Sequence, residues 1–445
     1  MTEQLQKDAN EYKTVAVLGL GYVGLPLALL LVSKGFRVLG IDPDGSKIEM
    51  LHRGISYNHE IEHDKIKEAI GSDRFLPTSQ HSAIKAADSI IICVPTPLTD
   101  YGTPDLSYLT AAASQVAEQL KEGQLVVLES STYPGTTREV LLPLLERSGL
   151  KVGKQFYVAY SPERVDPGNQ KYPLELIPKI VSGVTPECLE RISQLYGEVF
   201  PQIHPVSSTD TAEMSKILEN AHRLVNISFI NEIAMICDKL GLDVWEVIDA
   251  AATKPFGFTP YYPGPGIGGH CIPVDPSYLL WKVKQYGMNA EFIGLSNAVN
   301  HKMPLYVAQQ VRHALLPKSL SSASILIYGA AYKRDIADYR ESASIDIIRL
   351  LRLEGANVYY HDPYIPKLKL GDSLLYSSEL TPELLASMDA VVIATDHSGI
   401  PLTMLTEHAR LIYDTRNVLR HQPAGSGKAK IVRLGAGGAG DYENM

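Results

Sequence analysis

The fold of this chain is decided by the segment Thr14–Gly24, whose sequence is TVAVLGLGYVG. Its first five residues are apolar or β-branched, which is typical of a buried parallel strand. Gly19, Gly21 and Gly24 then form a G-x-G-x-x-G motif ahead of the helix-forming residues 25–33. A strand, a glycine-rich turn and a helix in this order predict a dinucleotide-binding unit, with the pyrophosphate at the helix N-terminus.

A carboxylate follows the next predicted strand, residues 37–41. Asp42 lies eighteen residues beyond Gly24, where a dinucleotide fold places the acceptor for the adenosine ribose. A negative charge here repels a 2′-phosphate, so the expected cofactor is NAD rather than NADP. Three further residues near the motif are expected to contact the cofactor: Tyr22, Val23 and Lys47.

Composition and charge exclude several classes of protein. The chain has 445 residues, enough for two or three domains, and its 45% hydrophobic and 20% charged residues are ordinary for a globular protein. Its net charge of −9, without a long run of one sign, argues against nucleic acid or an anionic membrane as partner. The sequence predicts no signal peptide and no membrane span, and its four cysteines include no CxxC pair. We therefore expect a cytoplasmic protein with reduced thiols and no metal site.

Three more strands are predicted at α/β spacing, over residues 89–94, 124–128 and 156–159, and polar loops follow them. In an open parallel sheet, loops at the carboxyl ends of the strands line the ligand crevice. The side chains that we expect to face this crevice are Thr96, Thr132 and Glu163. Each also has an ordinary interpretation, since threonine beside proline is common in turns and a glutamate at a strand end is usually solvated.

A long helix is predicted over residues 210–240, because this segment has no glycine or proline and a glycine follows it. At 1.5 Å per residue it is about 45 Å long, enough to bridge two domains and to pair with the same helix of a second subunit. Asp210 and Glu213 resemble a capping box at its start. Lys216 and Asn220 lie four residues apart on one face, either in a functional site or as a solvated pair.

A second glycine-rich stretch, PGPGIGGHCIPVD at residues 263–275, places the thiol of Cys271 after four glycines and four residues before Asp275. Glycine permits the close approach of another backbone or of a ligand, so we interpret this stretch as a bed that presents the sulfur to a small molecule. The alternative is a turn followed by a buried core cysteine, because free cysteine is among the most buried residues.

A second α/β unit is predicted after a linker at residues 319–324. Its strands are expected over residues 325–329, 357–360, 390–394 and 411–413. The turn after its first strand lacks the glycine motif but carries Lys333, with Arg340 further on, which suits a phosphate-bearing ligand rather than a second NAD. The glycine-rich end predicts a frayed tail. The predicted domains are therefore 1–205, 206–317 and 318–423, with a flexible tail over 424–445.

In combination, these motifs resemble those of the UDP-sugar 6-dehydrogenase family, which includes UDP-glucose and UDP-N-acetylhexosamine dehydrogenases. The resemblance covers roughly residues 13–420 and rests on these segments, in order: Gly19–Gly24, Val94–Pro97, Ser131–Thr132, Ser161–Glu163, Lys216 with Asn220, Gly268–Cys271 with Asp275, and Lys333–Arg340. It implies an α/β protein with an N-terminal NAD-binding Rossmann domain, a central helical domain that forms a homodimer or higher oligomer, and a C-terminal Rossmann-like domain for the UDP-sugar. It also implies a four-electron oxidation of the sugar C6 alcohol to a carboxylate by two NAD.

The resemblance also implies roles for individual residues. Cys271 is then the nucleophile that forms a thiohemiacetal and a thioester, and Lys216 and Asn220 stabilise the oxyanion at C6. Glu163 positions or deprotonates the hydrolytic water, while Asp275 holds Lys216 and another water. Thr132 is a further catalytic residue. Cofactor contacts are expected from Thr96, Thr132 and Arg340, and UDP-sugar contacts from Glu163, Arg164, Val165, Lys216, Asn220, Tyr262, Gly268 and Lys333.

Departures from the UDP-glucose branch indicate the sugar. Members of that branch usually carry a lysine where this chain has Val274, and often a second arginine where it has Asn417. The segment Pro263–Gly266 before the cysteine is similar to the N-acetylhexosamine branch. We therefore expect UDP-N-acetylglucosamine as the substrate, with UDP-N-acetylmannosamine and UDP-glucose as alternatives.

Two other functions stay open at this point. A two-electron dehydrogenase of hydroxy acids also has a Rossmann domain and long helices, but it needs neither a nucleophilic thiol nor a second α/β domain. It forms one NADH per substrate, whereas a UDP-sugar 6-dehydrogenase forms two. A non-catalytic NAD-binding protein, with Cys271 as a core residue, binds NAD without turnover of any nucleotide sugar.

Overall fold

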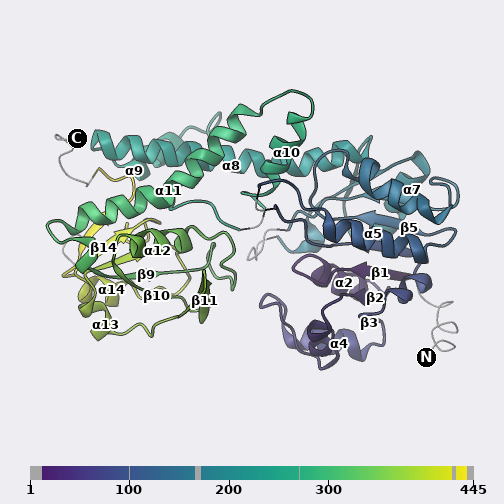
Figure 1. The fold of residues 1–445 in the computed structure, drawn as a ribbon, viewed down its shortest axis with the longest axis horizontal. Coiled ribbons are helices and arrows are strands. Elements are labelled where there is room, and N and C mark those ends of the chain that lie inside the picture. The colour runs from purple at the N-terminus through teal and green to yellow at the C-terminus, as the bar shows by residue number, and fades with distance from the viewer. Residues whose placement is uncertain (1–12, 100, 166–171, 270, 423–426, 438–445) are drawn as a thin grey trace. The chain divides into compact units, whose positions relative to one another are not determined.

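The structure is a computed structural model that describes residues 13–99, 101–165, 172–269, 271–422 and 427–437 (Figure 1). The chain divides into two compact units. The N-terminal unit comprises Met1–Glu219 and Ser277–Met288, and the C-terminal unit comprises Asn220–Pro276 and Asn289–Met445. The long helix α8, Thr209–Leu240, begins in the first unit and ends in the second.

An eight-stranded sheet forms the centre of the N-terminal unit, with the strand order β3-β2-β1-β4-β5-β6-β7-β8. Neighbouring strands of this sheet are parallel except β6 and β7. Its strands are β1 Thr14–Leu18, β2 Arg37–Ile41, β3 Phe75–Thr78, β4 Ser89–Ile92, β5 Leu125–Leu128, β6 Tyr157–Tyr160, β7 Lys179–Gly183 and β8 Ile203–Pro205. Because β1 lies between β2 and β4, the sheet has the switch point at which open α/β sheets bind ligands.

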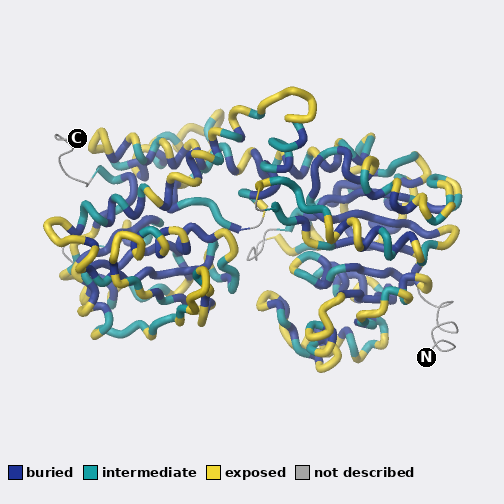
Figure 2. The backbone as a smooth tube through the Cα atoms, in the orientation of Figure 1, coloured by how far each residue is buried: buried dark blue, intermediate teal, exposed yellow. Residues whose placement is uncertain are grey.

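Helices pack on both faces of this sheet. Alternate residues of β1 enter opposite apolar clusters: Val15 and Val17 join one, and Ala16 and Leu18 join the other. Figure 2 shows the central strands of this sheet as buried, and every residue of β1, β2, β4 and β5 is buried. The helical segments are α2 Gly24–Ser33, α3 Gly45–His52, α4 His63–Gly71, η2 His81–Ala86, α5 Ser107–Gln119, η3 Thr137–Leu141, α6 Leu142–Leu145, η4 Glu146–Ser148, η5 Leu174–Leu176 and α7 Pro186–Val199.

The central segment is helical, as predicted, with α8 followed by α9 Val244–Ala252, α10 Asp275–Lys284 and α11 Glu291–Leu315. The predicted capping box at the start of α8 is wrong. Ser208 Oγ accepts the backbone N–H of Thr211 at 3.1 Å, as a helix cap does. The Glu213 carboxylate instead accepts the backbone N–H groups of Gly135 and Thr137, at 2.6 and 2.8 Å.

The C-terminal unit contains a parallel five-stranded sheet of order β10-β9-β13-β14-β15 and an antiparallel pair, β11 with β12. Its strands are β9 Ser324–Tyr328, β10 Asn357–His361, β11 Lys367–Leu370, β12 Ser373–Tyr376, β13 Ala390–Ile393, β14 Leu411–Asp414 and β15 Lys430–Arg433. Its helices are η6 Leu320–Ser322, α12 Ala343–Leu353, α13 Pro382–Ser387 and α14 Leu402–His408. The four strands predicted for this half are all present.

The predicted flexible tail over 424–445 is wrong for residues 427–437. There, β15 pairs with β14, and Trp245 Nε1 donates to the carbonyl oxygen of Leu434 at 2.8 Å. Asp238 of α8 accepts the backbone N–H groups of Gly435 and Gly437 at 3.2 and 3.1 Å. Residues 424–426 and 438–445 of the predicted tail lie outside the described residues.

Among the helices described, none combines the length and apolar character needed to cross a membrane.

Candidate functional site

The glycine-rich turn joins β1 to α2 with the geometry that nucleotide binding requires. A side chain at Gly24 would lie 1.8 Å from the carbonyl oxygen of Gly19, which itself has a φ of +89°. Both positions therefore need glycine for the turn itself. At Gly21 a side chain would meet no atom of the described residues within 4 Å, so packing among them does not explain that glycine. The open side of Gly21 fits the close approach of a pyrophosphate to the N-terminus of α2.

Asp42 lies directly after β2 and is buried against this turn. Its carboxylate accepts hydrogen bonds from the backbone N–H groups of Leu20 and Asp44, at 2.9 and 3.0 Å. Lys47 Nζ pairs with the same carboxylate at 3.1 Å, so the structure brings two of the predicted cofactor residues together. Tyr22 lies in the turn itself with an exposed side chain.

Thr96 and Thr132 follow the neighbouring strands β4 and β5, and both side chains are buried. Thr96 Oγ1 donates to the carbonyl oxygen of Ser131 at 2.7 Å, which joins the two loops. The hydroxyl of Thr132 is buried and has no hydrogen-bond partner among the described residues. Because buried hydroxyls are nearly always bonded, this one fits a side chain that faces a ligand.

Glu163 follows β6 and is 8% exposed, so its interpretation as a solvated side chain is wrong. Its Oε1 accepts the backbone N–H groups of Arg164 and Val165 at 2.6 and 2.7 Å, and its Oε2 accepts Nζ of Lys179 at 3.0 Å. Burial favours the neutral acid, but the Lys179 ammonium and these hydrogen bonds outweigh it and lower the pKa of Glu163. The carboxylate is therefore ionised at neutral pH.

Lys216, in the part of α8 that belongs to the N-terminal unit, is buried, and its charge contributes to the lowered pKa of Glu163. No hydrogen bond or ion pair is found for Lys216 Nζ within the described part of the chain. The guanidinium of Arg164 pairs with Glu219 at 2.6 Å and donates to the carbonyl oxygen of Pro178 at 2.9 Å. Arg164 thus anchors the loop after β6 to α8, and its contact with a substrate stays a prediction.

In the C-terminal unit, Cys271 has an exposed side chain, whereas the other three cysteines are buried, and none forms a disulfide. Its interpretation as a core residue is therefore wrong. The carbonyl oxygen of Cys271 accepts the backbone N–H of Asp275 at 2.9 Å, at the start of α10. The buried Asp275 carboxylate accepts Nδ2 of Asn220 at 2.6 Å, which ties the thiol-bearing turn to α8.

The glycines before Cys271 are explained by packing within the C-terminal unit. A side chain at Gly268 would lie 2.5 Å from the carbonyl oxygen of Glu341 and 2.7 Å from Cβ of Tyr332. One at Gly269, whose φ is +84°, would lie 2.6 Å from the Tyr332 ring. The close approach that these glycines allow is to protein atoms, which corrects their interpretation as a bed for a small molecule. Backbone contact of Gly268 with a substrate stays a prediction.

Three further predicted residues lie in the C-terminal unit. Arg340 pairs with Asp338 at 2.6 Å, and its carbonyl oxygen accepts the backbone N–H of Gly269 at 3.2 Å. Lys333 is partly exposed in the turn after β9. Tyr262 is exposed and stacks on Trp245, with 6.0 Å between the ring centroids. Their contacts with a ligand stay predictions.

Comparison with known proteins identifies the family. Three models of the UDP-glucose/GDP-mannose dehydrogenase family match the chain: the NAD binding domain over residues 13–200, the central domain over 210–302 and the UDP binding domain over 326–421. A UDP-N-acetyl-D-glucosamine 6-dehydrogenase from Pseudomonas aeruginosa is 35% identical over 412 residues, which are 91% of this chain and 95% of that protein. The chain belongs to the UDP-glucose/GDP-mannose dehydrogenase family.

Other members of the family are equally similar to this one. A UDP-N-acetyl-D-mannosamine dehydrogenase from Pyrococcus horikoshii is 35% identical over 425 residues, which are 92% of this chain and 97% of that protein. The structure of UDP-D-ManNAc dehydrogenase from Pyrococcus horikoshii has a TM-score of 0.86 and 33% identity, and the match covers 95% of this chain and 99% of that one.

Family membership decides several predictions. The fold class and NAD as the cofactor are confirmed, and the chain is an NAD-dependent UDP-sugar dehydrogenase. The UDP binding domain over residues 326–421 also excludes the hydroxy-acid dehydrogenases, which need no second α/β domain.

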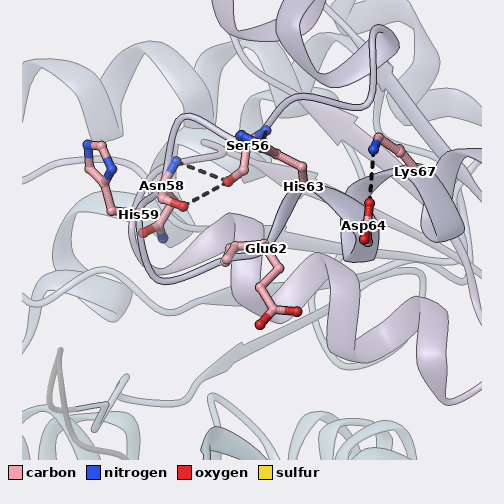
Figure 3. A pocket seen from close by; sticks show the side chains of 8 residues that line it. Ser56, Asn58, His59, Glu62, His63, Asp64 and Lys67 are labelled. Carbon is pink, nitrogen blue, oxygen red and sulfur yellow. Dashed lines mark hydrogen bonds and ion pairs between the residues drawn. The ribbon is translucent and has the colours of Figure 1, made fainter.

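The hollow drawn in Figure 3 belongs to the N-terminal unit of this dehydrogenase. Residues of the loop before α4 and of α4 itself line it, and Lys67 pairs there with Asp64 at 2.9 Å. None of the predicted site residues is among those that line it. The candidate site is therefore located by its motifs and not by this hollow.

Sequence reasoning missed three buried polar residues next to Glu163. Lys179 lies between the carboxylates of Glu163 and Glu129, and the hydroxyl of Tyr196 donates to Glu129. The only signal in the sequence is that an ionisable residue directly follows β5 and another begins β7. No motif links them, because they meet only in the folded sheet.

Proposed function

We propose that this dehydrogenase oxidises C6 of a UDP-N-acetylhexosamine to the uronic acid through a covalent intermediate on Cys271. The first candidate for the substrate is UDP-N-acetylglucosamine. The observation that carries the proposal is the exposed thiol of Cys271, one turn before the buried Asp275–Asn220 pair, in a chain with NAD and UDP binding domains. A thiol presented in this way suits nucleophilic catalysis better than packing.

The chemistry proceeds in three stages. NAD supplies the hydride acceptor for both oxidations. Loss of a hydride and a proton from the C6 alcohol gives an aldehyde, and the Cys271 thiolate adds to its carbonyl carbon to form a thiohemiacetal. Loss of the second hydride leaves a thioester. Water then adds to the thioester carbon, the carbon–sulfur bond breaks, and the acid and the thiol are released with the loss of a proton.

The buried polar residues suit the charges that develop in these stages. The side-chain amide of Asn220 has two N–H donors, and Asp275 accepts one of them at 2.6 Å. The second donor and the Lys216 ammonium are proposed to stabilise the oxyanion at C6. The lowered pKa of Glu163 makes its carboxylate a weak base at neutral pH. We therefore assign it the positioning of the hydrolytic water rather than removal of its proton.

The test is an NADH assay with a panel of UDP-sugars and identification of the product by mass. We expect two NADH per sugar and a higher kcat/KM for UDP-N-acetylglucosamine than for UDP-glucose. UDP-N-acetylmannosamine is the second candidate, favoured by the solved structure that has a TM-score of 0.86. One NADH per sugar contradicts the four-electron reaction. A preference for UDP-glucose contradicts the choice of sugar alone.

We further propose that α8 pairs with a second copy of the chain. Phe229, Ile236 and Leu240 lie on one face of α8 at helical spacing and are 55%, 45% and 66% exposed. Apolar side chains lined up in this way are costly in water and typical of an interface between subunits. Sedimentation equilibrium is expected to give the mass of a dimer, and Phe229→Asp to give a monomer. A monomeric mass for the unaltered protein contradicts this pairing.

A further inference from the structure

A chain of buried polar side chains leads from Glu163 into the interior of the N-terminal unit. Lys179 is 2% exposed, and its Nζ donates to Oε2 of Glu163 at 3.0 Å and to Oε2 of Glu129 at 2.9 Å. Glu129 is itself buried and accepts the hydroxyl of the buried Tyr196, in α7. The three charged residues belong to the neighbouring strands β5, β6 and β7 or to the residues that follow them. The sheet therefore fixes their spacing.

The ammonium of Lys179 is also enclosed by aromatic rings. Its Nζ lies 5.8 Å from the ring centroid of Tyr196 and 5.4 Å from that of Phe200. Aromatic faces attract a cation, most strongly where water is excluded. With two carboxylates and two rings around it, the ammonium has few other positions available. Because the ammonium is confined, it holds the carboxylates of Glu129 and Glu163 in fixed positions.

The cluster holds two carboxyl groups against one ammonium. Burial disfavours the charge of Lys179, but Glu129 and Glu163 outweigh it and raise the pKa of the ammonium. Burial raises the pKa of Glu129, whereas the Lys179 ammonium lowers that of Glu163 against the effect of burial. On acidification Glu129 therefore takes up a proton before Glu163 does, and the ion pair that persists is Lys179 with Glu163.

We propose that Lys179 is a positioning residue for Glu163: from the interior it fixes one oxygen of the catalytic carboxylate and keeps the group charged, while Glu129 and Tyr196 hold Lys179. This inference rests on the proposed role of Glu163 in thioester hydrolysis. The two backbone N–H groups hold Oε1 and Lys179 holds Oε2, so the carboxylate cannot rotate. The remaining lone pairs of the Glu163 carboxylate therefore have a fixed orientation and can orient a water molecule.

The first test is the pH profile of acid formation. Lys179→Met removes the ammonium that lowers the pKa of Glu163, so that pKa rises and Glu163 loses its charge at a higher pH. The fall of kcat at low pH, which is the acid limb of the pH profile, is expected to move to higher pH by about 1–3 units. Glu129→Gln leaves Lys179 paired with Glu163 alone, so its acid limb is expected at the wild-type pH or below. An acid limb that moves up in Glu129→Gln as well contradicts the assignment.

Two further variants keep the test decisive if the single change unfolds the protein. Lys179→Met/Glu129→Gln removes one charge of each sign, so the net charge of the buried cluster is unchanged. The acid limb of its pH profile is still expected to move to higher pH. Lys282→Met is the matched control, because it breaks a different ion pair of the N-terminal unit, with Glu139 at 2.7 Å. It is expected to leave the acid limb unchanged.

A readout that does not depend on turnover separates this inference from the proposed function. The infrared carboxylate band of Glu163, in protein labelled with ¹³C-glutamate and assigned with Glu163→Gln, is expected to titrate at a higher pH in the double variant than in the wild type. If the Glu163 band titrates at a higher pH in the double variant but the wild type oxidises no UDP-sugar, the positioning role stands and the proposed function is contradicted. If the band and the acid limb both stay at the wild-type pH, the positioning role is overturned.

Discussion

Cys271→Ser is expected to lower acid formation from the UDP-sugar by orders of magnitude without changing the fold. A serine hydroxyl is a far weaker nucleophile than a thiolate near neutral pH, and its ester is less reactive than a thioester. Because Cys271 is exposed, the nearly isosteric replacement removes no core contact. The measurements are NADH formation at saturating substrate and thermal unfolding of the two proteins.

Cys237→Ser is the matched control, because Cys237 is buried in an apolar cluster with Val244 and Trp245. It is expected to lower the unfolding temperature and to leave kcat near that of the wild type, the reverse of Cys271→Ser. A thiol-alkylating reagent should inactivate the wild type in step with modification of Cys271, and the UDP-sugar should slow it. Full acid formation by a well-folded Cys271→Ser variant defeats the covalent mechanism.

The elements that the sequence predicts best are those specified by neighbouring residues. The predicted bounds of β1 and β2 are the observed ones, because an apolar run followed by a glycine turn or a charged residue is a local signal. The long helix was predicted to within one residue, since it lacks glycine and proline and Gly241 ends it. The exposure of Cys271 contradicts the alternative of a buried core cysteine, and its presentation to a small molecule stays a prediction.

The features that the sequence does not predict depend on residues far apart in the chain. Glu213 looked like part of a capping box, but its carboxylate bonds to Thr137, 76 residues away, and burial raises its pKa to about 7. Lys179 meets Glu129 across 50 residues, with no motif to join them. Gly268 and Gly269 are explained by Tyr332, which only the folded C-terminal unit brings against them. In each case the role of the residue depends on a contact with a residue far away in the sequence, and not on its own type.

Lys216→Met is expected to lower kcat for acid formation roughly 10²–10³-fold, the usual effect of removing one oxyanion donor. Lys216 is buried and close enough to Glu163 to lower its pKa, so its charge lies near the carboxylate that is proposed to position the hydrolytic water. The measurement is kcat at the optimum pH of each variant. Lys239→Met is the control, because Lys239 is exposed at the far end of the same helix, and it is expected to keep the wild-type kcat.

The same variant distinguishes two ways in which Lys216 can act. As an oxyanion donor it contributes at every pH, so its loss lowers the plateau of the pH profile. Through Glu163 alone it acts only on the acid limb, which moves to higher pH because the pKa of Glu163 rises when a neighbouring positive charge is removed. We expect both effects, with the fall of the plateau the larger. A wild-type plateau with a shifted acid limb contradicts the oxyanion role and leaves Lys216, like Lys179, a residue that acts through Glu163.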